Sequence, residues 1–506
     1  LVSGLGDELV SGRVDPMSFR FGRSSGRLFG EVKPPIDLEP LLELGRKAET
    51  HFGRPQDIEW AFARGRFFLL QARNITRLST HGSEARAIRE RERARLLALV
   101  RGAEADEVVL AQNEISELLP EPTPFSLGWM EELWAYGGST DLACHTLGIP
   151  YDVLPDSPPF VVGAFGSLYV HRTEEKRRLS KGAGTIAAFR LSRAADEIER
   201  SWREDYLPGF LREMRIRESL DLSRLTLEET VDLFGRASSA FLTEDYVRAE
   251  TINIAADFYF KIAVRELEKA RLDPVTYLSQ LPKTVVNEAM GLLGRVGRGE
   301  AELSEFMRLY GHRAPQDYEL SHPRFQESPE VAMSMASRWA GGSACRSDRS
   351  ATAPAPPPIE KRVLRLAVDR ATRYQALKEE AKHHAMREFA CLRTLVLEIG
   401  RRIGVGDGVF YLTPTEVRRL GEPGFEISQA SRRILERQEF AEALRVTRLP
   451  REITVVALES MDVEGGSDTI LPRGAVNLRG TRVSGSGDVS GRARVLRRAE
   501  EIDDFQ

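Results

Sequence analysis

The stretch PQDIEWAFARGRFFLLQARNIT, residues 55–76, carries the strongest structural signal in the sequence. Polar and apolar residues alternate from Asp57 to Trp60, as in a strand with one solvent-exposed and one buried face. Phe67 to Gln71 is a second run of aromatic and aliphatic residues that fit a pleated sheet, and Gly65 stands between the two runs. The pattern predicts a β-hairpin that turns at Gly65.

A hairpin in this register brings three polar residues to one side: Glu59, Gln71 and Arg73. Carboxylate and amide oxygens are hard donors of the kind that Mg²⁺ takes together with nucleotide phosphates. A guanidinium group forms bidentate hydrogen bonds to phosphate oxygens. The chemistry of the three side chains is therefore that of a magnesium-bound polyphosphate site.

Two glycine-containing turns precede the hairpin. Gly4-Leu5-Gly6-Asp7 and Ser11-Gly12 lack bulky side chains at the positions where a backbone must approach a ligand closely. Their N–H groups can then reach a polyphosphate, so the turns are candidates for nucleotide contacts.

Taken together, these strings resemble the C-terminal half of the ATP-grasp domain in the phosphoenolpyruvate synthase and pyruvate phosphate dikinase superfamily. That family carries a Gly-Leu-Gly-Glu-like turn, a Pro-Gln-Asp-Ile-Glu-Trp strand and a Leu-Gln-Ala-Arg-Pro-Ile-Thr strand. This chain departs from the pattern at Asp7, where the family has Glu, and at Asn74, where it has Pro. Neither change removes a ligand.

The resemblance implies ATP and Mg²⁺ as cofactors. It assigns Glu59 and Gln71 as metal ligands and Arg73 as a phosphate contact. The implied nucleotide-binding set is Gly4, Gly6, Ser11, Gly12, Glu59, Gln71 and Arg73.

Composition points to a multidomain protein of the cytoplasm. At 506 residues, the rule of about 150 residues per domain predicts roughly three units. A net charge of -4 produces no overall electrostatic field that would attract nucleic acid or an anionic membrane. No apolar run approaches the ~20 residues of a membrane helix. Three isolated cysteines form no Cys-x-x-Cys pair, which suits a reducing compartment.

The middle of the chain is predicted to be mainly helical. Residues 83–109 are dense in Ala, Arg, Glu and Leu, and the longest helical pattern runs from Glu360 to about Ile403, ending at Gly404 and Gly406. A Pro/Ala linker at 351–359 separates two helical parts. Further helical patterns cover residues 190–218, 226–270, 275–297 and 301–310.

The residue composition changes after Pro450, from a helical pattern to one typical of strands and turns. Glu452 to Leu458 is predicted as a strand, and short strands with Gly/Ser turns are expected over 478–496. This last segment resembles the opening of the superfamily's swivelling phosphohistidine domain, in which the histidine comes later in a Thr-x-His-like motif. The chain is expected to stop at Gln506 before that histidine, and to lack the first ATP-grasp lobe of the same polypeptide.

The predicted fold is therefore multidomain, with three parts. Residues 1–80 are an α+β piece of the ATP-grasp domain, residues 81–465 a mainly α-helical acceptor domain, and residues 470–506 the β-rich start of the swivelling domain.

This order of parts resembles the rifampin phosphotransferases. Two short strings support the placement: Tyr310-Gly311-His312-Arg313 and Val409-Phe410-Tyr411-Leu412-Thr413 are similar to family segments. The resemblance implies a transferase of the dikinase type, a kinase that converts ATP to AMP and phosphate through a phosphohistidine carrier. The acceptor would be a hydroxylated small molecule.

Two places can supply the cations and the base that the acceptor end needs. His383, His384 and Arg387 lie close together on the long helix, and the resemblance favours Arg387. One turn later, drug-phosphorylating members are expected to have a basic residue where this chain has Cys391.

The second place is His312 and Arg313, followed by Asp317 and Glu319. A histidine beside an arginine and two carboxylates can act as a general base with orienting and phosphate-binding partners. The alternative is a structural role, in which His312 and Arg313 bridge helices through buried hydrogen bonds to the two carboxylates. The predicted catalytic set is Arg387, His312 and Arg313.

Two other functions stay open. A phosphoenolpyruvate synthase-like enzyme acting on pyruvate would have a pyruvate-binding barrel downstream. A non-catalytic helical binding module would have kept ATP-grasp flanks without their activity, although the presence of Glu59, Gln71 and Arg73 argues against loss of that site.

Overall fold

The protein is seen in a computed structural model that divides into two compact units, residues 1–82 and 83–506. Among the described residues, the helices are all too short or too polar to cross a membrane. The structure describes residues 20–21, 28–29, 34–52, 56–74, 82–179, 184–278, 284–341, 358–422, 427–444, 447 and 449–461.

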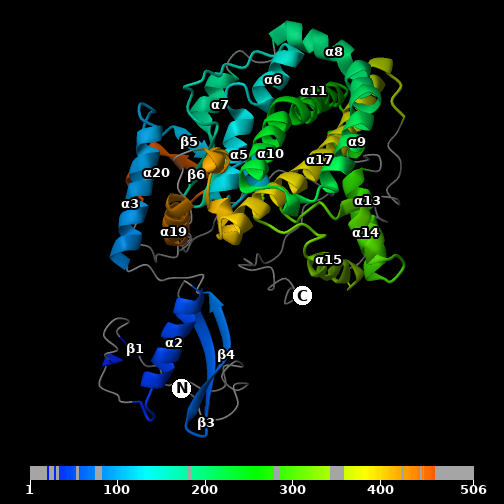
Figure 1. The fold of residues 1–506 in the computed structure, drawn as a ribbon. Helices are drawn as coiled ribbons and strands as arrows, with labels where there is room; N and C mark the ends of the chain where they lie inside the picture. Colours follow the sequence, from blue (N-terminus) through cyan, green and yellow to red (C-terminus); the bar gives the residue numbers. More distant parts are fainter. Residues whose placement is uncertain are drawn as a thin grey trace. The chain divides into compact units, whose positions relative to one another are not determined.

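The first unit is built around the predicted hairpin. Strands β3 (Gln56–Ala63) and β4 (Arg66–Asn74) pair antiparallel, and helix α2 (Glu39–Phe52) packs against both (Figure 1). Arg64 and Gly65 turn the chain with φ of 53° and 75°, as a two-residue hairpin loop of the primed type requires. A short ribbon, β1 (Arg20–Phe21) with β2 (Leu28–Phe29), completes the described part of this unit.

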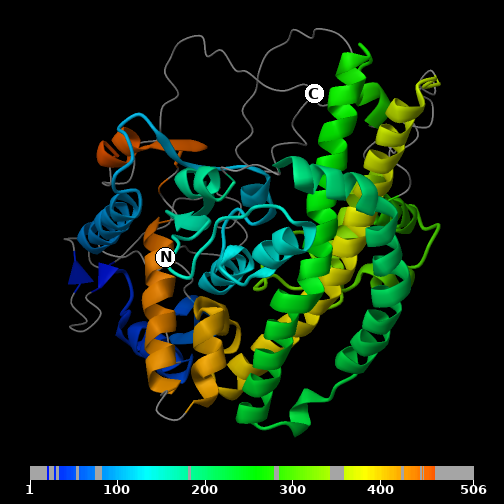
Figure 2. The same ribbon diagram turned by 90° about the horizontal axis from the view of Figure 1, so that it is seen from above.

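The second unit is mainly helical, as the sequence predicts. Its centre is α17 (Arg362–Arg402), which runs beside α11 (Tyr246–Lys269) in both views of the ribbon (Figures 1 and 2). The other helices of eight or more residues are α3 (Gly82–Leu99), α5 (Pro124–Trp134), α6 (Ser139–Leu147), α8 (Gly184–Arg200), α9 (Leu207–Glu218), α10 (Leu227–Ala240), α13 (Val285–Gly297), α14 (Leu303–Tyr310), α15 (Pro329–Gly341) and α19 (Ile427–Leu444).

Two of the long helical segments contain a π-helical turn. η1 (Ser201–Tyr206) joins α8 to α9, and η3 (Phe241–Asp245) joins α10 to α11. The two turns contact each other through a hydrogen bond that the Tyr206 hydroxyl donates to Asp245 at 2.7 Å. Such turns widen a helix by one residue and are frequent near functional sites.

The core of the helical unit is aromatic. Trp129, fully buried on α5, lies 5.6 Å from the ring of Phe241 and 6.0 Å from that of Phe389 on α17. Phe125 joins the same cluster. Buried aromatic groups of this size dominate core stability, so they fix α17 against the helices that surround it.

A four-stranded antiparallel sheet closes one side of the unit. Its order is β6 (Val161–Ala164), β7 (Ser167–His171), β5 (Val108–Ala111) and β8 (Glu452–Thr454). Strand β8 therefore returns from the end of the described chain to pair with a strand near the start of the unit.

Several short elements differ from the sequence predictions. The strand predicted over 452–458 ends at Thr454, whose hydroxyl accepts a hydrogen bond from the backbone N–H of Ala457 and caps helix α20 (Val455–Glu459). The helix predicted over 83–109 stops at Leu99, and β5 begins at Val108. The segment 470–506, predicted as the start of the swivelling domain, lies outside the described residues, as does most of the linker 351–359.

Candidate functional site

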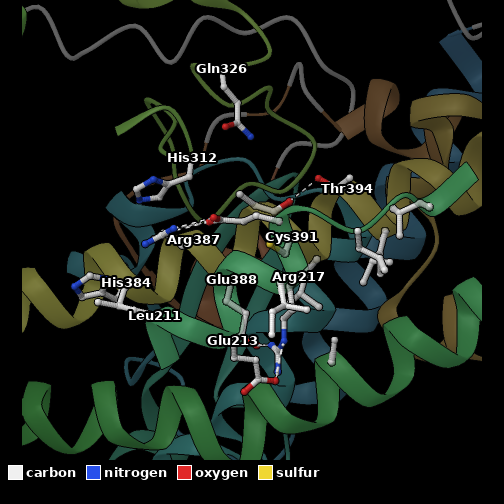
Figure 3. Close-up of a pocket in the computed structure, with 18 of the residues that line it drawn as sticks. Leu211, Glu213, Arg217, His312, Gln326, His384, Arg387, Glu388, Cys391 and Thr394 are labelled. Atoms are coloured by element: carbon white, nitrogen blue, oxygen red, sulfur yellow. Dashed lines mark hydrogen bonds and ion pairs between the residues drawn. The ribbon is translucent and has the colours of Figure 1, made fainter. Parts of the chain in front are cut away.

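A large cavity of about 1080 Å³ opens in the helical unit between α9, α10, α14 and α17 (Figure 3). Leucine, isoleucine, methionine and alanine side chains form its apolar wall. Its polar wall contains Arg217, Glu218, His312, His383, His384, Arg387, Glu388 and Cys391.

The cavity unites the two places that the sequence singles out separately. His312 lies against the long helix: its Nε2 is 3.2 Å from the carbonyl oxygen of His383, and the two rings are 4.6 Å apart. The ring of His384 follows at 5.2 Å from that of His383. Three imidazoles thus form a row along one wall.

Gly311 allows this approach. A Cβ at this position would lie 2.3 Å from the carbonyl oxygen of Met307 and 3.2 Å from the Cβ of Gln326. The chain therefore turns tightly at Gly311, directly after Tyr310, the last residue of α14. His312, the residue after Gly311, then reaches α17.

All three histidines are held neutral. Burial lowers the pKa of His383 to about 3 and that of His384 to about 4, and it lowers the pKa of His312 well below its usual value. The Arg387 guanidinium lowers each of these pKa values further. A neutral imidazole donates and accepts hydrogen bonds, but these three are weak bases at physiological pH.

Arg313 takes the structural role that the sequence left as an alternative. Its guanidinium binds the carboxylate of Asp317 through bonds of 2.6–3.1 Å, with Asp317 also accepting from the backbone N–H of Ala314. Glu319 accepts hydrogen bonds from Thr123 and Ser126, at 2.8–2.9 Å. These buried bonds fix the 313–319 turn to the rest of the fold. The carboxylates of Asp317 and Glu319 therefore stabilise this turn and do not orient His312.

We expect Asp317→Ala to lower the free energy of unfolding by about 3–5 kcal/mol, since it leaves the buried Arg313 guanidinium without its counter-charge. Denaturant unfolding followed by circular dichroism measures the loss. Asp232→Ala, which removes the carboxylate of the exposed pair with Arg236, should cost less than about 1 kcal/mol. Equal losses in the two variants would contradict the structural role of Asp317.

Two ion pairs cross between α9 and α17 at the polar wall. Arg387 donates to both carboxylate oxygens of Glu218, with Nη2 at 2.8 Å from each. One residue along each helix, Arg217 Nη1 donates to Glu388 at 2.5 Å. Figure 3 shows Arg217 and Glu213 together below Glu388, with Arg387 above it. Consecutive residues of one helix are thus paired with consecutive residues of the other.

Glu388 is the functional candidate that the sequence analysis missed. Its side chain is buried, and Oε2 has no hydrogen-bond partner among the described residues. Burial raises the pKa of Glu388 to about 8, and the nearby carboxylate of Asp245 raises it further against the lowering effect of Arg217. A carboxyl group with such a pKa, at the wall of a cavity, is a candidate for proton transfer. In the sequence it is one acidic residue among many on a charged helix.

Cys391 lies one turn beyond Arg387 and lines the cavity. Burial raises the pKa of its thiol to about 12, so it is neutral at physiological pH. The cation expected there in drug-phosphorylating members has no equivalent in this side chain.

In the first unit the strand register sets the predicted nucleotide residues beside each other. Glu59 is the Cα partner of Gln71, and Asp57 is the partner of Arg73, with a bulge directly after Glu59. Directly opposed and alternate residues share one face of an antiparallel pair. The positions 59, 71 and 73 therefore lie on one face, while Gly4, Gly6, Ser11 and Gly12 lie outside the described residues. Among the described side chains, no three His, Cys, Asp or Glu residues gather as a metal cluster.

Comparisons with known proteins match this part of the chain to a known nucleotide-binding domain. Residues 36–94 match the family of the pyruvate phosphate dikinase AMP/ATP-binding domain. A probable phosphoenolpyruvate synthase of Methanocaldococcus jannaschii is 36% identical over 91 residues, 17% of this chain and 8% of the relative.

Two further relatives match over similar lengths. A probable phosphoenolpyruvate synthase of Archaeoglobus fulgidus is 28% identical over 153 residues, 23% of this chain and 20% of the relative. A rifampicin phosphotransferase of Streptomyces sviceus is 37% identical over 103 residues, 15% of this chain and 12% of the relative. The matches span a fifth or less of the length of these relatives.

Proposed function

Because the chain belongs to the phosphoenolpyruvate-utilising superfamily of phosphotransferases, we propose that it is part of a dikinase-type, rifampin phosphotransferase-like enzyme. The enzyme would convert ATP to AMP and phosphate through a phosphohistidine and phosphorylate a hydroxylated small molecule. The observation that carries the proposal is the cavity in which Arg387, Glu388 and three neutral histidines meet.

The nucleotide end of the reaction belongs to the first unit. Glu59 and Gln71, opposed in the hairpin register, fit two oxygen ligands of Mg²⁺, and Arg73 two residues along fits a phosphate contact. The metal would neutralise charge on the nucleotide phosphates. The match to an AMP/ATP-binding domain over residues 36–94 supports this assignment.

The acceptor end belongs to the cavity. In our proposal the Arg387 guanidinium binds the incoming phosphoryl group, because its fork matches two phosphate oxygens. Glu388 takes the proton of the attacking hydroxyl, since its pKa of about 8 makes it a stronger base than His312, whose pKa lies well below 6.5. The neutral histidines then hold the hydroxyl or the phosphate by hydrogen bonds.

Cavity size and lining favour a bulky acceptor. A volume of about 1080 Å³ is at the upper end for small-molecule sites, and a three-carbon keto acid would fill little of it. Apolar side chains such as Leu211, Leu233 and Leu395 suit a large hydrocarbon body beside the reacting hydroxyl. These features support a hydroxylated acceptor over pyruvate.

The direct test is acceptor-dependent formation of AMP by the full-length polypeptide that carries this chain. Bulky hydroxylated compounds and pyruvate are supplied with ATP and Mg²⁺, and ³¹P NMR follows the products. The proposal expects a phosphate ester together with AMP and inorganic phosphate. Phosphoenolpyruvate formation alone would favour the synthase reaction, and absence of AMP with every acceptor would favour a binding module.

We expect Glu388→Gln to remove a pH-dependent step. A base must be ionised, so acceptor phosphorylation by the unaltered enzyme should rise with pH up to about 8 and level off above it, as the carboxyl group of Glu388 loses its proton. The variant should be slower by about 10²-fold and lack that rise. The pH profile of kcat/KM measures both effects. An unchanged profile in the variant would assign the proton transfer to another group.

A further inference from the structure

The bidentate contact between Arg387 and Glu218 occupies the guanidinium that the proposed function assigns to phosphate. Both carboxylate oxygens of Glu218 lie 2.8 Å from Nη2 of Arg387, and Nε donates to the first at 3.0 Å. A carboxylate in this geometry fills the two positions that two phosphate oxygens would take. The Nε/Nη2 edge of Arg387 cannot receive a phosphoryl group without giving up this partner.

Glu218 is the last residue of α9, and α9 forms one wall of the cavity. Leu211, Glu213, Ile216 and Arg217 of the same helix also line it. The contact between Arg387 and Glu218 therefore ties the end of a wall-forming helix to the centre of the polar site.

The other end of α9 has features that favour bending of a helix. The helix follows the π-helical turn η1 directly, and its first turn contains Pro208 and Gly209. Proline removes one backbone hydrogen bond, glycine is permissive, and π turns are a recognised cause of bends in helices. A bend after Tyr206 would move the C-terminal end of α9 while leaving α8 in place.

The far end of α9 is attached to α17 by two ion pairs, Arg217 with Glu388 and Arg387 with Glu218. The Glu218 and Arg387 side chains are 37% and 23% exposed, so water and dissolved anions reach this pair. Ile216 at the same end is 69% exposed. Phe210 and Met214 anchor α9 in the interior, and Arg217 pairs with the buried Glu388, so opening of the far end must also release the pair of Arg217 with Glu388.

We propose that α9 is a lid over the acceptor cavity and that Glu218 holds the lid closed by occupying Arg387 until a phosphate group displaces the carboxylate. Glu218 is a positioning residue in this scheme, because it acts through Arg387. It keeps the end of α9 against α17 when no phosphoryl group is present and couples arrival of phosphate to a wider opening for the acceptor. The inference rests on the proposed function only in naming phosphate as the displacing anion.

The lid can be tested without catalysis, on the chain with inorganic phosphate as the probe. Cys391 lines the cavity, so its alkylation by N-ethylmaleimide, mapped by mass spectrometry, reports opening. Saturating phosphate should accelerate alkylation of Cys391 about fivefold in the unaltered chain. Glu218→Gln should show the faster rate without phosphate, no further response to it, and phosphate binding about fivefold tighter by calorimetry.

Two controls accompany the lid experiment. Asp232→Asn removes a carboxylate from the exposed pair with Arg236 at the cavity rim but does not touch Arg387, so both readouts should stay unchanged. The buried thiol of Cys144 should label slowly in every sample, which excludes unfolding. The lid is disproved if Glu218→Gln labels at the original rate, or if phosphate slows labelling. If the unaltered full-length enzyme showed no ATP turnover, the proposed function would be refuted, but the lid would not.

Discussion

Arg387→Ala should reduce phosphorylation of the acceptor by about 10²- to 10³-fold, because the variant loses a preorganised cation at the transferring phosphoryl group. The nucleotide half of the reaction should be spared, since Glu59, Gln71 and Arg73 belong to the other unit. Single-turnover formation of AMP and multiple-turnover formation of phosphate ester separate the two halves.

Arg401→Ala is the matched control for Arg387→Ala. Arg401 lies on the same helix and pairs with Glu398, but it is exposed and does not line the cavity. Its removal should leave both halves of the reaction within twofold. If Arg387→Ala slowed AMP formation as much as ester formation, Arg387 would not be specific to the acceptor step.

Glu59→Ala should lower conversion of ATP to AMP by about 10³-fold or more, because a metal ion bound to transferring phosphates supplies several kcal/mol of charge stabilisation and each 1.4 kcal/mol is tenfold. Arg73→Ala should act in the same direction. The measurement is AMP production at saturating Mg²⁺, with circular dichroism to show that the fold persists.

Glu43→Ala serves as the control for Glu59→Ala. Glu43 is an exposed acidic residue of α2 that pairs with Lys47 at 3.0 Å, so its loss removes a charge from the same unit without touching the proposed ligands. Unchanged AMP formation in both Glu59→Ala and Arg73→Ala would overturn the nucleotide roles assigned to the hairpin.

Local signals predicted the large elements well. The long helix, expected from Glu360 to about Ile403, spans Arg362–Arg402 and ends where Gly404 adopts a φ of 76°. The hairpin turns at Gly65 as expected. These features depend on propensity, capping and turn chemistry, which a single sequence displays directly.

The acceptor cavity depends on contacts that no local pattern carries. His312 and His383 are 71 residues apart, and Arg217 and Glu388 are 171 apart. The sequence therefore presented the histidines as two separate sites. Arg217 and Glu218 carry no signal of their own in the sequence, because only the packing of α9 on α17 shows their partners.

Arg313 shows that neighbouring residues can also leave a role undecided in the sequence. Its neighbours Asp317 and Glu319 are visible in the sequence, but the same residue types fit a catalytic group and a buried structural pair equally well. Burial decides between them: Asp317 and Glu319 are 8% and 1% exposed, and each has its hydrogen bonds satisfied within the fold.

The pairing of β5 with β8 has a consequence for how such enzymes diversify. Val108 and Thr454 are Cα partners, so the chain enters and leaves this sheet on adjacent strands. Segments whose two ends meet in space tolerate transplantation between proteins. The whole stretch between these strands thus has the geometry of a segment that can be exchanged between proteins as one piece.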